Sequence, residues 1–225
     1  MKVVSFIPFW NQYEYESKQL VDRDTKRLSG QFLINYPIEL ANKINSISNT
    51  YLFTNDKRIS ELVDSRLKFE VIGRDVDLDS QSVSVEEIIR SFLNNVQADV
   101  VVLLHPKSPF VKKESLEECI NMVISGQHDS AFLAKIERKF AWYQGKRINY
   151  DVKHGTPHLS AIEPIILETS SAYVFTRESF QKNGTRIGKN PYIKPVGSFE
   201  GLVISTPEDI KVAEYLLDSQ FNVDD

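Results

Sequence analysis

Short apolar segments alternate along the first half of the chain with longer amphipathic ones. Runs rich in β-branched and aromatic residues at 3–7, 50–53 and 100–104 predict strands. The last of these is apolar on both faces, as a central strand of a parallel sheet is. Apolar positions three or four residues apart predict helices, which we expect at residues 32–47, 59–63, 85–96 and 115–124. Repeated strand–helix–strand order predicts a doubly wound, mainly parallel α/β sheet.

The second half of the chain is less regular. We expect strands at residues 129–136, 171–175 and 202–204, and a closing helix from Pro207 to about residue 217. The polar stretch 138–164 carries aromatic residues but few periodic cues. We interpret residues 1–225 as one domain and residues 138–164 as an excursion from its sheet, of the kind that serves as a dimerisation arm. The alternative is that the aromatic rings of this stretch cover the sheet of their own domain.

Composition narrows the function classes. The chain has 225 residues, 41% of them hydrophobic and 26% charged, with a net charge of −4 and a pI near 5.7. These values are typical of a globular protein and argue against a binder of duplex nucleic acid, which needs clustered cations. No apolar run reaches the ~18 residues that cross a bilayer, so we expect no membrane insertion and a cytoplasmic location. Cys119 lies in an apolar-periodic stretch and is expected in the core.

A long polar connection follows the first predicted strand, from Phe9 to Gly30. Its cations include Lys18 and Arg23, and cations at the end of a first parallel strand are well placed to bind a triphosphate. The alternative is a solvated surface loop with scattered charge. The connection is neither a Walker loop nor a Rossmann glycine fingerprint.

Two further sites follow predicted strands. His105 and Pro106 come directly after the buried strand 100–104, at the sheet edge where ligands bind in open α/β folds. Without a partner at metal-ligand spacing, His105 is expected to hydrogen-bond a ligand and not to act as a base. Asp75 and Asp77 form a D-x-D pattern, which is the metal clamp of many glycosyltransferases but also a common solvated turn.

Five segments form an ordered set. Ile-Pro ends at Pro8, S-K-Q-L-V-D-R-D begins at Ser17, K-R-L-S-G-Q-F-L and Y-P-I-E follow without a gap, and L-L-H-P-K-S-P-F begins at Leu103. Acylneuraminate cytidylyltransferases have I-P, S-K-R-x-x-x-K-N, R-P-L-x-G-K-P-L, Y-x-I-E and L-L-Q-P-T-S-P-L-R in this order. The chain resembles this family. Weaker matches extend over most of the chain, at Thr54–Asp56, Asp79–Ser82, Ser170–Phe175 and Thr206–Asp209.

The resemblance implies an enzyme that transfers CMP from CTP to a nonulosonic or related acidic sugar and releases pyrophosphate, with Mg²⁺ as cofactor and a homodimer as assembly. Lys18 and Arg23 would neutralise the phosphates. The implied nucleotide contacts are Pro8, Ser17, Asp79, Ser82, His105 and Pro106, and the implied acceptor contacts are Ser170, Ser171 and Tyr173.

Several positions depart from the family pattern. The family reads I-D-I-D-T-P-E-D, and its two aspartates hold Mg²⁺, whereas this chain has Val203 and Ser205 there. Trp10 stands where the family has an arginine, so a phosphate contact is also missing. Glu200 is then the nearest carboxylate that could reach a metal at this edge. Two alternatives stay open, namely an inactive nucleotide-binding relative and a glycosyltransferase that uses Asp75 and Asp77.

Overall fold

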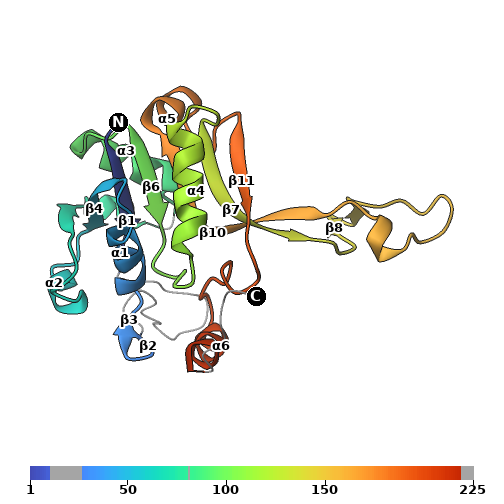
Figure 1. The fold of residues 1–225 in the computed structure, drawn as a ribbon, viewed down its shortest axis with the longest axis horizontal. Coiled ribbons are helices and arrows are strands. Elements are labelled where there is room, and N and C mark those ends of the chain that lie inside the picture. Colours follow the sequence, from blue (N-terminus) through green and yellow to red (C-terminus); the bar gives the residue numbers. More distant parts are fainter. Residues whose placement is uncertain (11–26, 81, 219–225) are drawn as a thin grey trace.

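The computed structural model describes residues 1–10, 27–80 and 82–218 (Figure 1). Seven strands of this part form one sheet in the order β11-β7-β10-β6-β1-β4-β5. Their bounds are β1 Val3–Pro8, β4 Ile47–Thr54, β5 Glu70–Gly73, β6 Val100–Leu104, β7 Ser130–Glu137, β10 Ile165–Thr176 and β11 Pro191–Pro195. β10 runs antiparallel to both of its neighbours, and the other adjacent pairs are parallel. The predicted mainly parallel α/β sheet is confirmed.

Helices cover both faces of the sheet (Figure 1). They are α1 Asn35–Asn42, α2 Ile59–Leu62, α3 Val85–Asn95, α4 Lys113–Ile124, α5 Arg177–Asn183 and α6 Pro207–Asp218, with short 3-10 turns η1 Val76–Asp79 and η2 Leu159–Ala161. α1 and α4 pack on one face with Ile38 and Ile120, while α3 and α5 pack on the other with Ile89 and Phe180. Cys119 is buried in the first of these layers, as expected. No helix in the described ranges is long and apolar enough to cross a membrane.

Local sequence signals explain several of these boundaries. Ser84 and Glu87 form a reciprocal capping box at the start of α3, in which each side chain accepts a hydrogen bond from the other residue's backbone N–H. α5 ends at Gly184, whose φ of 74° is the left-handed value that glycine adopts without a steric penalty. The helices that pack on the sheet are therefore defined by their own sequences.

Three sequence predictions need correction. The helix expected at residues 32–47 spans only Asn35–Asn42, because Arg27–Leu28 (β2) and Gln31–Phe32 (β3) form a hairpin before it and Ile47 already begins β4. The strand expected at 202–204 is not a strand: Ile204 packs with Leu28, Phe110 and Leu216 in a third cluster under α6, and its N–H bonds to the Lys107 carbonyl at 2.8 Å. The sequence analysis missed β11, an edge strand bounded by prolines, a residue that edge strands tolerate.

Residues 138–164, here called the arm, extend away from the sheet (Figure 1). β7 and β10 pair as far as Glu137 and Ile165, and the arm beyond them holds a hairpin of Trp142–Tyr143 (β8) and Lys146–Arg147 (β9) and the turn η2. Phe140, Trp142 and Tyr143 have exposed fractions of 42%, 55% and 65%. The alternative that these rings cover their own sheet is therefore wrong.

Candidate functional site

The chain order puts the switch point of the sheet between β1 and β6. From β1 the chain continues to β4 and β5 on one side and then returns to β6 on the other, so β1 and β6 flank the switch point of the sheet. In open α/β sheets, ligands bind at the carboxyl ends of the strands that flank such a point. Pro8 ends β1, and His105 and Pro106 follow β6 directly. These three predicted nucleotide contacts therefore lie at the carboxyl ends of two paired strands.

Two backbone hydrogen bonds fix the position of His105, and its imidazole is neutral at physiological pH. Its N–H donates to the Ser171 carbonyl at 3.2 Å, and its carbonyl accepts from the Ser108 N–H at 3.1 Å. Burial, together with the nearby charges of Lys107 and Arg186, lowers the pKa of His105 to about 4. A neutral imidazole has one donor and one acceptor nitrogen, so it suits a neutral ligand group such as a base or a hydroxyl.

A bulge in β10 carries the predicted acceptor contacts. Glu168 pairs with Ala134 and Tyr173 pairs with Phe132, so the four residues between them face a single residue of β7. Within the bulge, Thr169 is buried and its hydroxyl donates to the Leu133 carbonyl at 2.9 Å. Ser170 is exposed with a φ of 57°, an uncommon value for a residue other than glycine. The bulge thus presents Ser170 next to the His105 turn, which Ser171 contacts through its carbonyl.

Tyr173 and Arg186 form a polar network on the same side of the edge. The Tyr173 hydroxyl donates to Glu168 at 2.8 Å, and burial is the main cause that raises the pKa of this tyrosine. The Arg186 guanidinium lies 4.4 Å from the centre of the Tyr173 ring and pairs with Glu86 at 3.0 Å. Sequence reasoning found Tyr173 but missed Arg186, which lies between α5 and β11 with no motif around it.

Asp79 is engaged by two neighbours at the ends of β4 and β5. Its carboxylate accepts hydrogen bonds from Asn55 and from Arg74. The guanidinium of Arg74 also lies 4.5 Å from the centre of the Trp10 ring, so a buried cation stands beside the residue that replaces the family's arginine. Asp79 therefore organises this corner of the site, and Arg74 is a second residue that the sequence analysis missed.

The remaining predicted positions are exposed or outside the described residues. Ser82 is exposed, and its hydroxyl lies 2.9 Å from that of Ser80. In the D-x-D pattern, the Asp75 carboxylate accepts the Asp77 N–H at 3.1 Å and so begins η1. Ser17, Lys18 and Arg23 lie outside the described residues.

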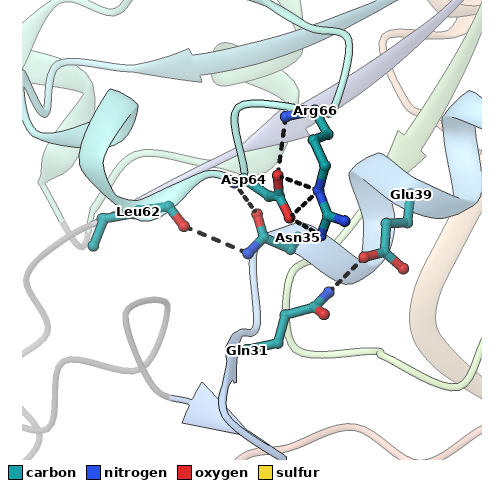
Figure 2. A network of polar contacts seen from close by, with 6 residues as sticks. All are labelled: Gln31, Asn35, Glu39, Leu62, Asp64 and Arg66. Atoms are coloured by element: carbon teal, nitrogen blue, oxygen red, sulfur yellow. Dashed lines mark hydrogen bonds and ion pairs between the residues drawn. The ribbon is translucent and has the colours of Figure 1, made fainter.

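The β2–β3 hairpin follows at residues 27–32. A network of polar contacts connects this hairpin, α1 and the turn after α2 (Figure 2). Asn35 accepts the Asp64 N–H at 3.0 Å, and Gln31 donates to Glu39 at 2.8 Å. Arg66 holds the Asp64 carboxylate and lowers its pKa to about 2. A cavity of about 490 Å³ lies between the hairpin and the turn after α2.

Comparison with known proteins identifies the family. The sequence pattern of the cytidylyltransferase family matches residues 15–152, which is more than half of the chain. The chain belongs to the cytidylyltransferase family. The predicted enzyme class, a CTP-dependent cytidylyltransferase, is therefore confirmed, and the nature of the acceptor is a separate question.

Solved structures show the same fold. A CMP:2-keto-3-deoxy-manno-octonic acid synthetase complexed with CTP has a TM-score of 0.69 at 15% identity, over 98% of this chain and 100% of its own. A 4-diphosphocytidyl-2C-methyl-D-erythritol synthase from Anaerococcus prevotii has a TM-score of 0.67 at 11% identity, over 96% of each chain. No curated protein matches the sequence. At these identities the likeness supports the fold of this cytidylyltransferase and leaves its acceptor open.

The edge that faces residues 200–209 does not fit a metal held by protein carboxylates. Glu200 is buried, and one of its oxygens accepts the Lys112 N–H at 3.2 Å. Asp209 accepts the Ser205 and Thr206 N–H groups at 2.8 and 2.7 Å and so begins α6. Within the described ranges, no three His, Cys, Asp or Glu side chains are grouped as a metal site requires. With Val203 and Ser205 between them, the described residues at this edge of the cytidylyltransferase do not offer the paired oxygen ligands that Mg²⁺ prefers.

Proposed function

We propose that the protein transfers CMP from CTP to an acidic sugar of the nonulosonic (sialic) type and releases pyrophosphate. The observation that carries the proposal is the switch point between β1 and β6, with the neutral His105 at the end of β6 and the Ser170 bulge beside it. The family assignment supports the nucleotide, and the bulge supports a polar acceptor. A cytoplasmic location and the Mg²⁺ requirement, both expected from the sequence analysis, stay predictions.

In this reaction a hydroxyl oxygen of the acceptor attacks the α-phosphorus of CTP, and the bond to the pyrophosphate oxygen breaks. The protein's part is positioning and charge neutralisation, because no covalent intermediate is needed. His105 would hydrogen-bond the nucleotide, and Ser170, Ser171 and Tyr173 would orient the acceptor. Lys18 and Arg23 would neutralise the phosphates.

A pyrophosphate-release assay tests the proposal. The purified protein is mixed with each of the four nucleoside triphosphates and a panel of sialic, legionaminic, pseudaminic and Kdo-type acids, with Mg²⁺ present. Of the four nucleotides, only CTP is expected to release pyrophosphate, and it should do so in the presence of at least one of the acids. Replacing Lys18 or Arg23 with Ala should weaken CTP binding by about 1.5–3 kcal/mol, the range for hydrogen bonds to charged groups. An equal response to all four nucleotides contradicts the proposal.

A second candidate is a relative that binds CTP without turning it over. Val203 and Ser205 at the positions of the family's metal aspartates favour this reading. It predicts CTP binding with no pyrophosphate release from any acid of the panel. The glycosyltransferase reading of Asp75 and Asp77 predicts instead the release of free nucleotide from a preformed nucleotide sugar. The cytidylyltransferase pattern across residues 15–152 disfavours it.

We also propose that two copies assemble through the arm. Its exposed rings Phe140, Trp142 and Tyr143 are of the kind enriched at interfaces, and they stand away from the body (Figure 1). Ile166 and Leu167, where β10 leaves the arm, add exposed apolar surface with fractions of 51% and 44%. Light scattering at micromolar concentration should give twice the chain mass of 25.8 kDa, and a mass that stays at one chain on concentration contradicts the assembly.

A further inference from the structure

A lysine lies where the metal carboxylates are missing. Lys135 is a half-buried residue near the end of β7, and strand alternation puts its side chain on the α4 face with Ala131 and Leu133. A Cβ added at Gly201 would lie 2.7 Å from Cε and 3.2 Å from Cγ of this lysine. The stem of Lys135 therefore passes directly over Gly201, and the missing side chain of Gly201 gives it room.

Gly201 fixes where this cation lies relative to the candidate site. Residue 201 opens the segment that carries positions 203 and 205, and the same added Cβ would lie 2.9 Å from the Thr169 methyl group in the β10 bulge. Lys135 thus lies between the acceptor bulge and the segment where the family's aspartates would stand. Both are at the edge where β6 presents His105.

The charges around Lys135 leave its ammonium available. Among residues 1–10, 27–80 and 82–218, no hydrogen bond or ion pair engages this group. Glu137, the nearest carboxylate along the strand, pairs with Lys139, and the charge of Lys135 is the smallest of the causes that lower the pKa of Glu137. Glu200 and Asp209 hold backbone N–H groups, as described above. A half-buried ammonium with no carboxylate of the described residues at ion-pair distance is suited to bind an anion from outside the chain.

We infer that Lys135 binds an anionic oxygen of the reactants and supplies charge neutralisation that protein-held Mg²⁺ cannot supply here. The inference rests on the proposed function. The oxygen belongs either to the CTP phosphates or to the carboxylate of the acceptor, and both have the same chemistry for an ammonium. Nucleotide binding by this protein is then independent of a divalent ion.

Two ligands and two buffers test the inference without relying on turnover. Calorimetry measures the affinity of CTP, and separately of N-acetylneuraminate, in Mg²⁺ and in EDTA. EDTA is expected to change the parent affinity for CTP by less than about threefold. Lys135→Gln, which removes the charge and shortens the side chain, is expected to weaken the binding of one of the two ligands about 10- to 100-fold, the range of one charge-assisted hydrogen bond. The ligand that weakens identifies the source of the oxygen.

Control variants separate a lost contact from a lost fold. Lys43→Gln removes the same charge from an exposed lysine after α1, next to the opposite edge of the sheet, and should change neither affinity. Lys135→Arg keeps the charge and should retain more binding than Lys135→Gln. Gly201→Ala places a methyl group where the lysine stem runs and should weaken the same ligand. The unfolding midpoint of each variant is measured first and must equal that of the parent protein.

The outcomes are distinct. CTP binding that is present in Mg²⁺ and lost in EDTA overturns the inference while leaving the proposed function intact. Full affinity of Lys135→Gln for both ligands also overturns it. If the parent binds neither ligand in either buffer, the proposed function fails and the inference fails with it.

Discussion

The sheet body and the arm use the same kinds of side chain in opposite ways. In the body, Phe6 and Phe92 are fully buried and stack at 4.2 Å between their ring centres. In the arm, Trp142 is 55% exposed although Arg147 lies over its ring. The body has helices on both faces of its sheet, whereas no helix of the described chain covers the arm (Figure 1). The difference shows that aromatic content alone does not say whether the rings will pack inside their own chain or stay exposed to contact a second molecule.

The largest expected effect is a loss of unfolding free energy when a buried aromatic ring of the sheet body is removed. Phe92 also lies within 5.8 Å of the Tyr51 ring and 5.9 Å of the Phe53 ring, so Phe92→Ala removes a shared contact of three aromatic rings. A buried Phe→Ala change costs about 3–5 kcal/mol of unfolding free energy. Urea unfolding followed by far-ultraviolet circular dichroism measures it. A loss below about 1 kcal/mol would mean that the packing of this layer is not what holds the body together.

The next effect tests whether the body buries a titratable group at its ligand edge. The pKa of His105 is about 4 in the folded chain against 6.5 for an ordinary histidine. Between these values the unfolded chain binds a proton that the folded chain does not, so stability falls as pH drops from about 6.5 to about 4. The unfolding free energy lost over this range is about 3 kcal/mol, because each unit of pKa difference corresponds to about 1.36 kcal/mol.

His105→Gln removes this contribution and should flatten the fall. Because carboxylates also titrate in this range, the quantity to compare is the difference in unfolding free energy between parent and variant at pH 7 and pH 4.5. His154→Gln, at an exposed histidine of the arm, is the matched control. Parallel curves for the parent and the His105→Gln variant would place the imidazole in contact with water and remove the argument for a neutral nucleotide contact.

The sequence was most informative for the body. The strands at 3–7 and 100–104 and the helix at 85–96 could be predicted closely, because their apolar periods and caps are local signals. The strand expected at 202–204 failed because Leu202 and Ile204 pack under α6, a contact between distant segments that periodicity does not encode. β11 was missed because its prolines suggest a loop and its edge position is set only by the finished sheet.

The candidate site divides in the same way. Pro8 and His105 could be found from strand ends and from the resemblance, and the structure places them at the carboxyl ends of two paired strands. Arg186, Arg74 and Lys135 could not be found, because each acts through neighbours that are far away in sequence. The resemblance draws attention to the segment of Val203 and Ser205, but only the fold shows a lysine beside it.

A smaller effect tests the arm as an interface. Trp142→Ala should weaken the proposed dimer by about 2 kcal/mol, the threshold for an interface hot spot, which is about a 30-fold rise in its dissociation constant. The unfolding free energy of the monomer should stay within about 0.5 kcal/mol, because the ring covers nothing in its own body. Sedimentation equilibrium measures the first quantity. Tyr215→Ala, which removes a ring of α6 that is 67% exposed, is the control, and an equal effect there would show that the arm is not the interface.

The smallest expected effect on global stability comes from Asn149, which ties the arm together. Its amide donates to the Lys139 and Glu163 carbonyls at 2.8 Å each and accepts the Ala141 N–H at 3.0 Å. Asn149→Ala removes three hydrogen bonds worth about 1 kcal/mol each at most, so the amides of the arm should exchange hydrogen markedly faster. Amides of β1 and β6 should keep the parent's protection, and the global unfolding free energy should change by less than about 0.5 kcal/mol. Asn95→Ala removes one hydrogen bond to the Ser91 carbonyl at the end of α3 and serves as the control, because it should speed exchange only within its own helix and not in the arm. If Asn149→Ala lowers the protection of the body as well, the arm and the body unfold as one unit and the contrast between them does not hold.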